Sequence, residues 1–256
     1  MVETVRQAPE LHGIPQARWR LSDVREALSW LRHYSLPGIS LALKRLKVSR
    51  QRGRLHLHSP DLAYQEKLVW IERARSLAVL PGRRVAFLYG DEVSFYRQPT
   101  LAATYAPRGQ APLAHLAANA NTRYRVCGAL DAATGQLTWV AHAKIGVINL
   151  KRFLTKLRRT YPERPLVLAW DNRPIHLHPA VLETAADLEI QLLWLPTYAP
   201  WTNPIEKVWR KLKQELLHHH RLAEHWAALR QRVKTWLEQF TQPSPELLRY
   251  CGLLPK

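Results

Sequence analysis

The sequence predicts an α/β fold after about residue 83, preceded by a small domain rich in α-helix. Two observations predict it. Before that point the apolar residues mostly follow helical spacing, whereas beyond it short apolar runs typical of buried strands alternate with amphipathic helical segments. The 256 residues, 46% of them hydrophobic, are enough for one large domain or for a small domain and a medium one.

Short helices and a basic turn are expected in the first 60 residues. Ser22 is expected to cap one helix, and Ser35 is expected to start the next. Residues 50–58 then suggest an arginine-rich turn and a short strand. Two small helices followed by a basic hairpin predict a winged helix-turn-helix that binds DNA, over residues 1–60.

A longer helix is expected to connect this domain to the next. Ser59 suits its cap and Pro60 its first residue, and the helical pattern runs to about Leu80. Pro81 and Gly82 then end it. We therefore expect a linker helix at 61–82 and a second domain at 83–256.

The second domain begins with strands and continues with alternating helices and strands. Strands are expected at 85–95, 123–130, 137–141, 166–170 and 190–195, and helices at 147–160, 178–186, 203–217 and 222–240. Three strands in a meander followed by alternating units are typical of an α/β layer fold of the ribonuclease H kind.

Positive charge dominates the composition, with 38 Lys and Arg against 20 Asp and Glu and a net charge of +18. Such an excess favours a polyanionic partner. One cluster contains no acid, and we expect it to contact DNA phosphates, with a solvated helix face as the alternative. Its members are Lys44, Arg45, Lys47, Arg50, Arg52 and Arg54.

The sequence shows no sign of secretion or of a membrane span. It has no apolar segment long enough to cross a bilayer and no signal peptide, and Cys127 and Cys251 form no disulfide framework. We therefore expect a soluble, intracellular protein with no membrane partner.

Three acids stand where strand ends and helix starts of such a fold converge. Asp91 lies in the first strand, Asp171 directly follows the strand 166–170, and Glu206 is in the first turn of a helix. Three converging carboxylates repel one another unless cations lie between them. Two divalent ions suit phosphodiester cleavage, and oxygen ligands suit Mg²⁺ or Mn²⁺.

Each acid also has a purely structural interpretation. Asn203, Pro204 and Glu206 match the cap, first and third positions of a helix start. Asp171 with Asn172 suits a turn after a strand. Glu92 competes with Asp91, because neighbouring strand residues face opposite ways, and the residues alone leave that choice open.

The histidines at 176 and 178 and at 218–220 invite a zinc interpretation. They lack partner cysteines and the helical spacing of a zinc site. A polar surface role or a phosphate contact is the preferred interpretation for them.

Three segments carry a resemblance to a known family. The segments 90–96 (GDEVSFY), 170–176 (WDNRPIH) and 195–213 (LPTYAPWTNPIEKVWRKLK) resemble the three blocks of a DDE transposase. The branch is the bacterial insertion-sequence transposases of the mariner superfamily. Between Asp171 and Glu206 lie 34 residues, and between Asp91 and Asp171 lie 79, both as in that branch. Residues 44–52 and 59–64 resemble its winged helix-turn-helix and linker.

This resemblance implies a ribonuclease H-like (retroviral integrase-like) core and a transposase activity. That activity is cleavage of double-stranded DNA at terminal inverted repeats and strand transfer into target DNA, typically at TA. The resemblance implies that Asp91, Asp171 and Glu206 hold two Mg²⁺ ions, with Mn²⁺ as a substitute, and it selects Asp91 over Glu92. Four further residues are expected to support the site, namely Asn172, His176, Asn203 and Pro204. A homodimer in the synaptic complex and a location at the cytoplasmic nucleoid are also expected.

Two other functions stay open. One is a truncated or domesticated copy that binds DNA without catalysis, and the other is a ribonuclease H-like nuclease that cuts without joining. The complete triad argues against the first, and the wing and linker helix argue against the second. Members of the family commonly begin with a further helical unit, so we expect this chain to be one product of a split reading frame or a truncated copy.

Overall fold

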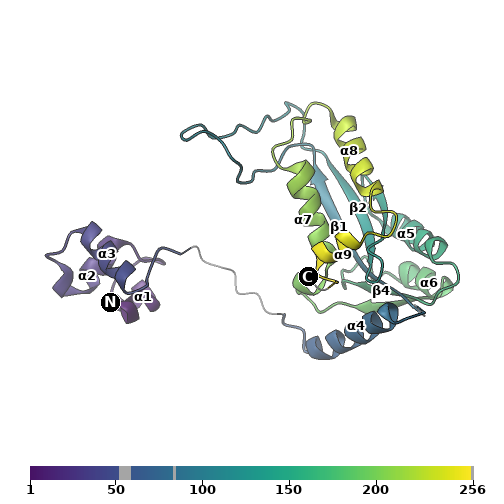
Figure 1. Ribbon diagram of the computed structural model, residues 1–256, viewed down its shortest axis with the longest axis horizontal. Helices are drawn as coiled ribbons and strands as arrows, with labels where there is room; N and C mark the ends of the chain where they lie inside the picture. The colour runs from purple at the N-terminus through teal and green to yellow at the C-terminus, as the bar shows by residue number, and fades with distance from the viewer. Residues whose placement is uncertain (52–58, 83–84, 255–256) are drawn as a thin grey trace. The chain divides into compact units, whose positions relative to one another are not determined.

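The computed structural model describes residues 1–51, 59–82 and 85–254 (Figure 1). The chain divides into two compact units, Met1–His56 and Leu57–Lys256. Within the described ranges, no helix is both long enough and apolar enough to cross a membrane.

The first unit is a small bundle of short helices. It contains α1 (Val2–Arg6), α2 (Leu21–Ala27) and α3 (Leu36–Arg45), with 3₁₀ turns at Pro9–His12 and Ser29–Leu31. Its core consists of Val24, Leu31, Ile39 and Leu43. The short strand expected here falls on residues 52–58, outside the described residues, as do Arg52 and Arg54.

The two helix starts expected in this unit have different outcomes. Ser35 caps α3 as predicted, its Oγ accepting the backbone N–H of Gly38 at 3.2 Å. The prediction that Ser22 caps a helix is wrong, because α2 already begins at Leu21. The carboxylate of Asp23 instead accepts a hydrogen bond from the backbone N–H of Arg20 at 2.9 Å. An acid in the first turn thus pairs with the backbone N–H of the residue before the helix.

The linker helix α4 (Tyr64–Val79) begins later than the sequence suggested, and Ser59 and Pro60 are not its cap and first residue. The hydroxyl of Ser59 donates to the carbonyl of Thr197 at 2.5 Å. Asp61 accepts from the backbone N–H of Thr197 at 2.9 Å and from Lys67 at 2.7 Å. The polar groups before the helix therefore bind a distant loop.

A five-stranded sheet forms the centre of the second unit, in the order β3-β2-β1-β4-β5. The strands are β1 (Ala86–Tyr96), β2 (Arg123–Asp131), β3 (Leu137–His142), β4 (Leu166–Trp170) and β5 (Ile190–Trp194). The first three pair antiparallel, and β4 and β5 are added parallel to β1. This arrangement confirms the predicted α/β fold of a meander followed by alternating units.

Helices cover both faces of the sheet (Figure 1). On one face lie α5 (Val147–Thr160) and α6 (Pro179–Asp187), against side chains such as Ala86 and Leu88. On the other lie α4, α7 (Ile205–Leu212), α8 (Trp226–Glu238) and α9 (Pro245–Cys251), against Phe87 and Tyr89. The alternation along β1 thus divides the core into two layers.

A long irregular segment, 97–122, joins β1 to β2, and the histidine run holds its base. The hydroxyl of Thr100 lies 2.8 Å from Nδ1 of His218. Nε2 of His219 lies 2.6 Å from the carbonyl oxygen of Ala102. These two histidines therefore anchor a loop within the fold.

Candidate functional site

A cleft of about 470 Å³ gathers most of the residues singled out in the catalytic blocks. Its lining consists of Asp91, Asp171, Asn172, Arg173, Pro174, residues 195–200, Asn203 and Glu206. The three acids thus come together from β1, from the end of β4 and from α7. His176 and Pro204 do not line the cleft, and the basic cluster that begins at Lys44 belongs to the first unit.

Asp91 is held by a tryptophan from α7. Nε1 of Trp209 donates to Oδ2 of Asp91 at 2.9 Å. The ring of Trp209 packs directly on Gly128 of β2, which is the cross-strand partner of Asp91. A Cβ at Gly128 would lie 2.7 Å from the ring, so this position needs glycine. The sequence reasoning missed both residues, although a glycine inside an apolar strand signals close approach by another group.

The environment of Asp91 strongly disfavours its charge. Burial raises the pKa of Asp91 to about 8, and the charges of Glu206, Glu92 and Asp171 add to the effect. For Glu206, desolvation raises the pKa, Lys213 opposes the rise and Asp171 adds to it. Burial and the neighbouring carboxylates therefore disfavour the simultaneous ionisation of Asp91 and Glu206.

Behind Asp171 lies a fully buried histidine. Nδ1 of His176 is 2.6 Å from Oδ1 of Asp171 and 3.0 Å from the carbonyl oxygen of the same residue. Its ring stacks on Trp170, with centroids 3.8 Å apart and planes at 19°. His176 is thus fixed against the side of Asp171 that faces into the protein.

Glu92 meets the other nitrogen of that histidine. Nε2 of His176 is 2.8 Å from Oε1 of Glu92, and Nη1 of Arg173 is 3.0 Å from Oε2. Burial lowers the pKa of His176, but the bonds to Asp171 and Glu92 outweigh it and raise that pKa to about 9. Of the two neighbouring acids on β1, Asp91 lines the cleft and Glu92 binds His176.

The start of α7 differs from the predicted cap. The helix begins at Ile205, with Pro204 as the residue before it, and Asn203 makes no capping bond. The buried amide of Asn203 instead donates from Nδ2 to the carbonyl of Gly90 at 3.0 Å. Glu206 still lies in the first turn, as expected. Asn203 therefore ties α7 to β1 next to Asp91.

Asn172 connects two walls of the cleft. Its Nδ2 donates to the hydroxyl of Thr197 at 2.9 Å, which joins the segment after β4 to the segment after β5. Thr197 is in turn held by Asp61 and Ser59, so the start of the linker region also supports this wall.

Among the described residues, no group of three His, Cys, Asp or Glu side chains is arranged so as to hold a metal ion. The three carboxylates line one cleft and act on each other electrostatically. Carboxylate oxygens are the donors that Mg²⁺ and Mn²⁺ prefer. The donor chemistry and the mutual repulsion of the carboxylates therefore fit divalent cations of this class.

Comparisons with known proteins also indicate an enzyme that cleaves nucleic acid. A family model described as a DDE superfamily endonuclease matches residues 86–229, more than half of the chain. A Shigella sonnei relative, the insertion element IS630 uncharacterized 39 kDa protein, is 27% identical over 155 residues. The match covers 59% of this chain and 44% of the relative, so the chain spans less than half of that protein's length.

The fold also resembles solved structures of a mariner transposase. The Mos1 paired-end complex with Mn has a TM-score of 0.65 at 19% identity, covering 97% of this chain and 75% of that one. The Mos1 strand transfer complex has a TM-score of 0.62 at 19% identity, covering 93% and 75%. At 19% identity, these similarities are evidence for a shared fold alone.

Proposed function

The chain belongs to the DDE superfamily of endonucleases, and from this premise we propose that it is the transposase of an insertion sequence. It cleaves double-stranded DNA at terminal inverted repeats and joins the freed ends to target DNA, typically at TA. The observation that carries this proposal is the meeting of Asp91, Asp171 and Glu206, from three separate elements, in one cleft. The similarity to the Shigella sonnei protein, which is encoded by an insertion element, supports the proposal.

Asp91, Asp171 and Glu206 are the proposed ligands of two Mg²⁺ ions, for which Mn²⁺ substitutes. When bound, such ions activate the attacking oxygen and stabilise the leaving oxygen of an in-line displacement at phosphorus. Trp209 orients Asp91, and Asn203 with Pro204 sets the position of the helix that carries Glu206. Burial and the neighbouring carboxylates raise the pKa of Asp91, and a bound cation would favour its ionised form.

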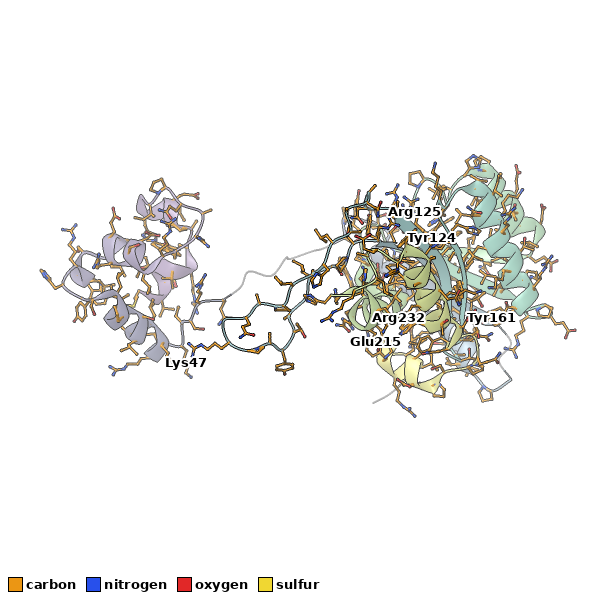
Figure 2. The ribbon with its side chains drawn as sticks, turned by 90° about the horizontal axis from the view of Figure 1, so that it is seen from above. Lys47, Tyr124, Arg125, Tyr161, Glu215 and Arg232 are labelled. Carbon is orange, nitrogen blue, oxygen red and sulfur yellow. The ribbon has the colours of Figure 1, made fainter. Side chains whose placement is uncertain are left out.

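The basic cluster at the end of the first unit is the proposed contact to DNA phosphates. Lys44 and Arg45 are in the last turn of α3, and Lys47, labelled in Figure 2, follows where the backbone turns with φ 59°. Arg50 continues the cluster. These cations support a winged helix-turn-helix over residues 1–60 that holds DNA through contacts to the phosphate backbone of the duplex. A homodimer in the synaptic complex, acting at the cytoplasmic nucleoid, completes the proposal.

Incubation of the purified chain with duplexes taken from both flanks of its gene tests this function. We expect Mg²⁺-dependent nicks at an inverted repeat, followed by joining of the new 3′ ends to a plasmid. Products are resolved on denaturing gels, and a chelator serves as the control. Binding without cleavage would indicate a non-catalytic DNA-binding protein, and cleavage without joining would indicate a nuclease; either result contradicts the proposal.

A further inference from the structure

A chain of three side chains, Asp171, His176 and Glu92, runs from the cleft to the opposite face of the sheet. We propose that His176 is a positioning residue that fixes the carboxylate of Asp171, and that Glu92 in turn fixes His176. The inference deepens the proposed function, because it rests on Asp171 being a metal ligand.

The geometry gives His176 one role toward Asp171. Its Nδ1 lies 2.6 Å from Oδ1, which holds one carboxylate oxygen toward the protein and leaves Oδ2 free of that bond. The same nitrogen is 3.0 Å from the carbonyl of Asp171, and the backbone N–H of His176 donates to the carbonyl of Arg173 at 2.8 Å. The ring thereby closes the 171–176 turn onto its first residue. The side chain of Asp171 has two rotatable torsions, each with more than one allowed setting, and this contact favours the setting in which Oδ1 meets Nδ1.

The histidine itself has no room to turn. Its side chain is 0% exposed, its ring stacks on Trp170, and its second nitrogen is 2.8 Å from Oε1 of Glu92. Glu92 is 6% exposed, and Arg173 binds its other oxygen at 3.0 Å. Each member is therefore held by the next, which is how supporting groups orient a metal ligand.

The arrangement also explains the pair of acids on β1. Neighbouring residues of a strand face opposite sides of the sheet. Asp91 faces the cleft, whereas Glu92 reaches Asp171 through His176 from the other side. β1 thus carries one proposed ligand, Asp91, and supports a second, Asp171, through the contact of Glu92 with His176.

Three substitutions at His176 distinguish the roles of its two ring nitrogens. In His176→Asn the amide nitrogen replaces Nδ1, in His176→Gln it replaces Nε2, and His176→Phe keeps only the stacking on Trp170. The readout is the affinity for Mn²⁺ alone, measured by electron paramagnetic resonance without DNA, with a thermal melt to confirm folding. We expect about 10- to 100-fold weaker Mn²⁺ binding in the Gln and Phe variants, which lose the contact to Asp171. A smaller loss is expected in Asn, which keeps that contact but loses the one to Glu92.

Two variants of Glu92 extend the test without touching the histidine. Glu92→Gln keeps an acceptor for His176 and is expected to bind Mn²⁺ within a few-fold of wild type. Glu92→Leu removes the acceptor and is expected to lose about tenfold or more. His178→Asn is the matched control, because that histidine is exposed and only caps α6, and Asn preserves a cap.

Several outcomes would overturn the inference. Wild-type affinity in folded His176→Phe contradicts it, and so does weaker binding in Asn than in Gln. Wild-type affinity in Glu92→Leu removes the part assigned to Glu92. Wild-type protein that binds Mn²⁺ but cleaves no DNA contradicts the proposed function alone, whereas protein that binds no Mn²⁺ contradicts both.

Discussion

The indole Nε1 of Trp209 donates a 2.9 Å hydrogen bond to Oδ2 of Asp91, and the same ring covers Gly128 on the next strand. Trp209 is on α7, three residues after Glu206. Trp209 therefore links the helix that carries Glu206 to the strand that carries Asp91, as Asn203 does just before that helix begins.

Gly128→Ala is expected to displace that tryptophan. The new Cβ would lie 2.7 Å from the ring, and Trp209 is 1% exposed, so the ring has little space to retreat. Overpacking of this kind typically costs about 1–3 kcal/mol of unfolding free energy. We also expect the rate of DNA cleavage to fall in protein that is still folded, because the hydrogen bond from Trp209 to Asp91 is lost. Denaturant unfolding and the nicking assay measure the two effects. Gly146→Ala is the control, since nothing lies within 4 Å of its added Cβ.

Substitutions at Asn203 distinguish an anchor from a cap. Asn203→Ala leaves the carbonyl of Gly90 without its donor, which typically costs about 1–3 kcal/mol in a buried setting. A capping role would be rescued by Asn203→Asp, because aspartate is a good cap. The anchoring role predicts no rescue, since a carboxylate donates no hydrogen bond and adds charge near Asp91. Stability restored by the Asp variant would favour the cap.

The contrast between cap and anchor shows what the sequence could predict. The strands and α5 follow from periodicity, which is a property of short segments. Asp171 and Glu206 follow from their places at a strand end and a helix start, whereas the choice of Asp91 over Glu92 came from the family resemblance. Asn203 matched a local helix-start pattern, but its amide bonds a residue 113 positions away. Ser59 likewise bonds Thr197, 138 positions away. Local patterns do not show which distant group competes for a polar side chain.

The same limit applies to the partners of the acids. Trp209 and Gly128 meet only when α7 packs on the sheet, and His176 meets Glu92 only through the pairing of β1 with β4. The short helix α9 was not predicted, because its seven residues give little periodicity. Residue types at the cleft were therefore predictable, whereas the contacts that orient them depend on the tertiary fold.

Asp61 gives a stability effect that depends on pH. Its bonds to Lys67, Thr197 and Ala63 lower the pKa of Asp61 from 3.8 to about 2. A depressed pKa contributes stability that is fully present above the unfolded value and is lost as the pH falls toward the folded one. We expect Asp61→Asn to melt below wild type at neutral pH, with the gap closing between about pH 4 and about pH 2. Melts across that range measure it, and a gap that widens in acid would contradict the assignment.

The basic cluster gives a prediction about salt. Replacing Lys44, Lys47 and Arg50 with Ala should weaken duplex binding for every sequence, because phosphate contacts carry no sequence information. The slope of log affinity against log salt should flatten by up to about one unit per lost contact. Arg6→Ala is the control in the same unit, since Arg6 pairs with Glu3 at 3.8 Å. An unchanged slope in the triple variant would remove these residues from the DNA contact.

Asp171→Asn tests the proposed metal site while keeping the shape of the side chain. The charge of Asp171 raises the pKa of both Asp91 and Glu206, so its loss reduces the repulsion that a cation relieves. In the wild type, Mg²⁺ or Mn²⁺ should raise the melting temperature by mass action, because the ions bind the folded arrangement and not the unfolded chain. The variant should lose that response, still bind DNA, and fail to nick it.

The melting temperature without metal distinguishes the site from a simple turn. Asn keeps an oxygen for His176, and the relieved repulsion offsets the loss of the charged partner, so we expect little change without metal. If Asp171 only stabilised the turn after β4, metal would not change the melting temperature of the wild type, and the variant would nick DNA at the wild-type rate. Asp187→Asn is the control, because Asp187 is exposed at the end of α6 and should respond to metal as the wild type does. Wild-type nicking by Asp171→Asn would refute the mechanism, whatever the melting data show.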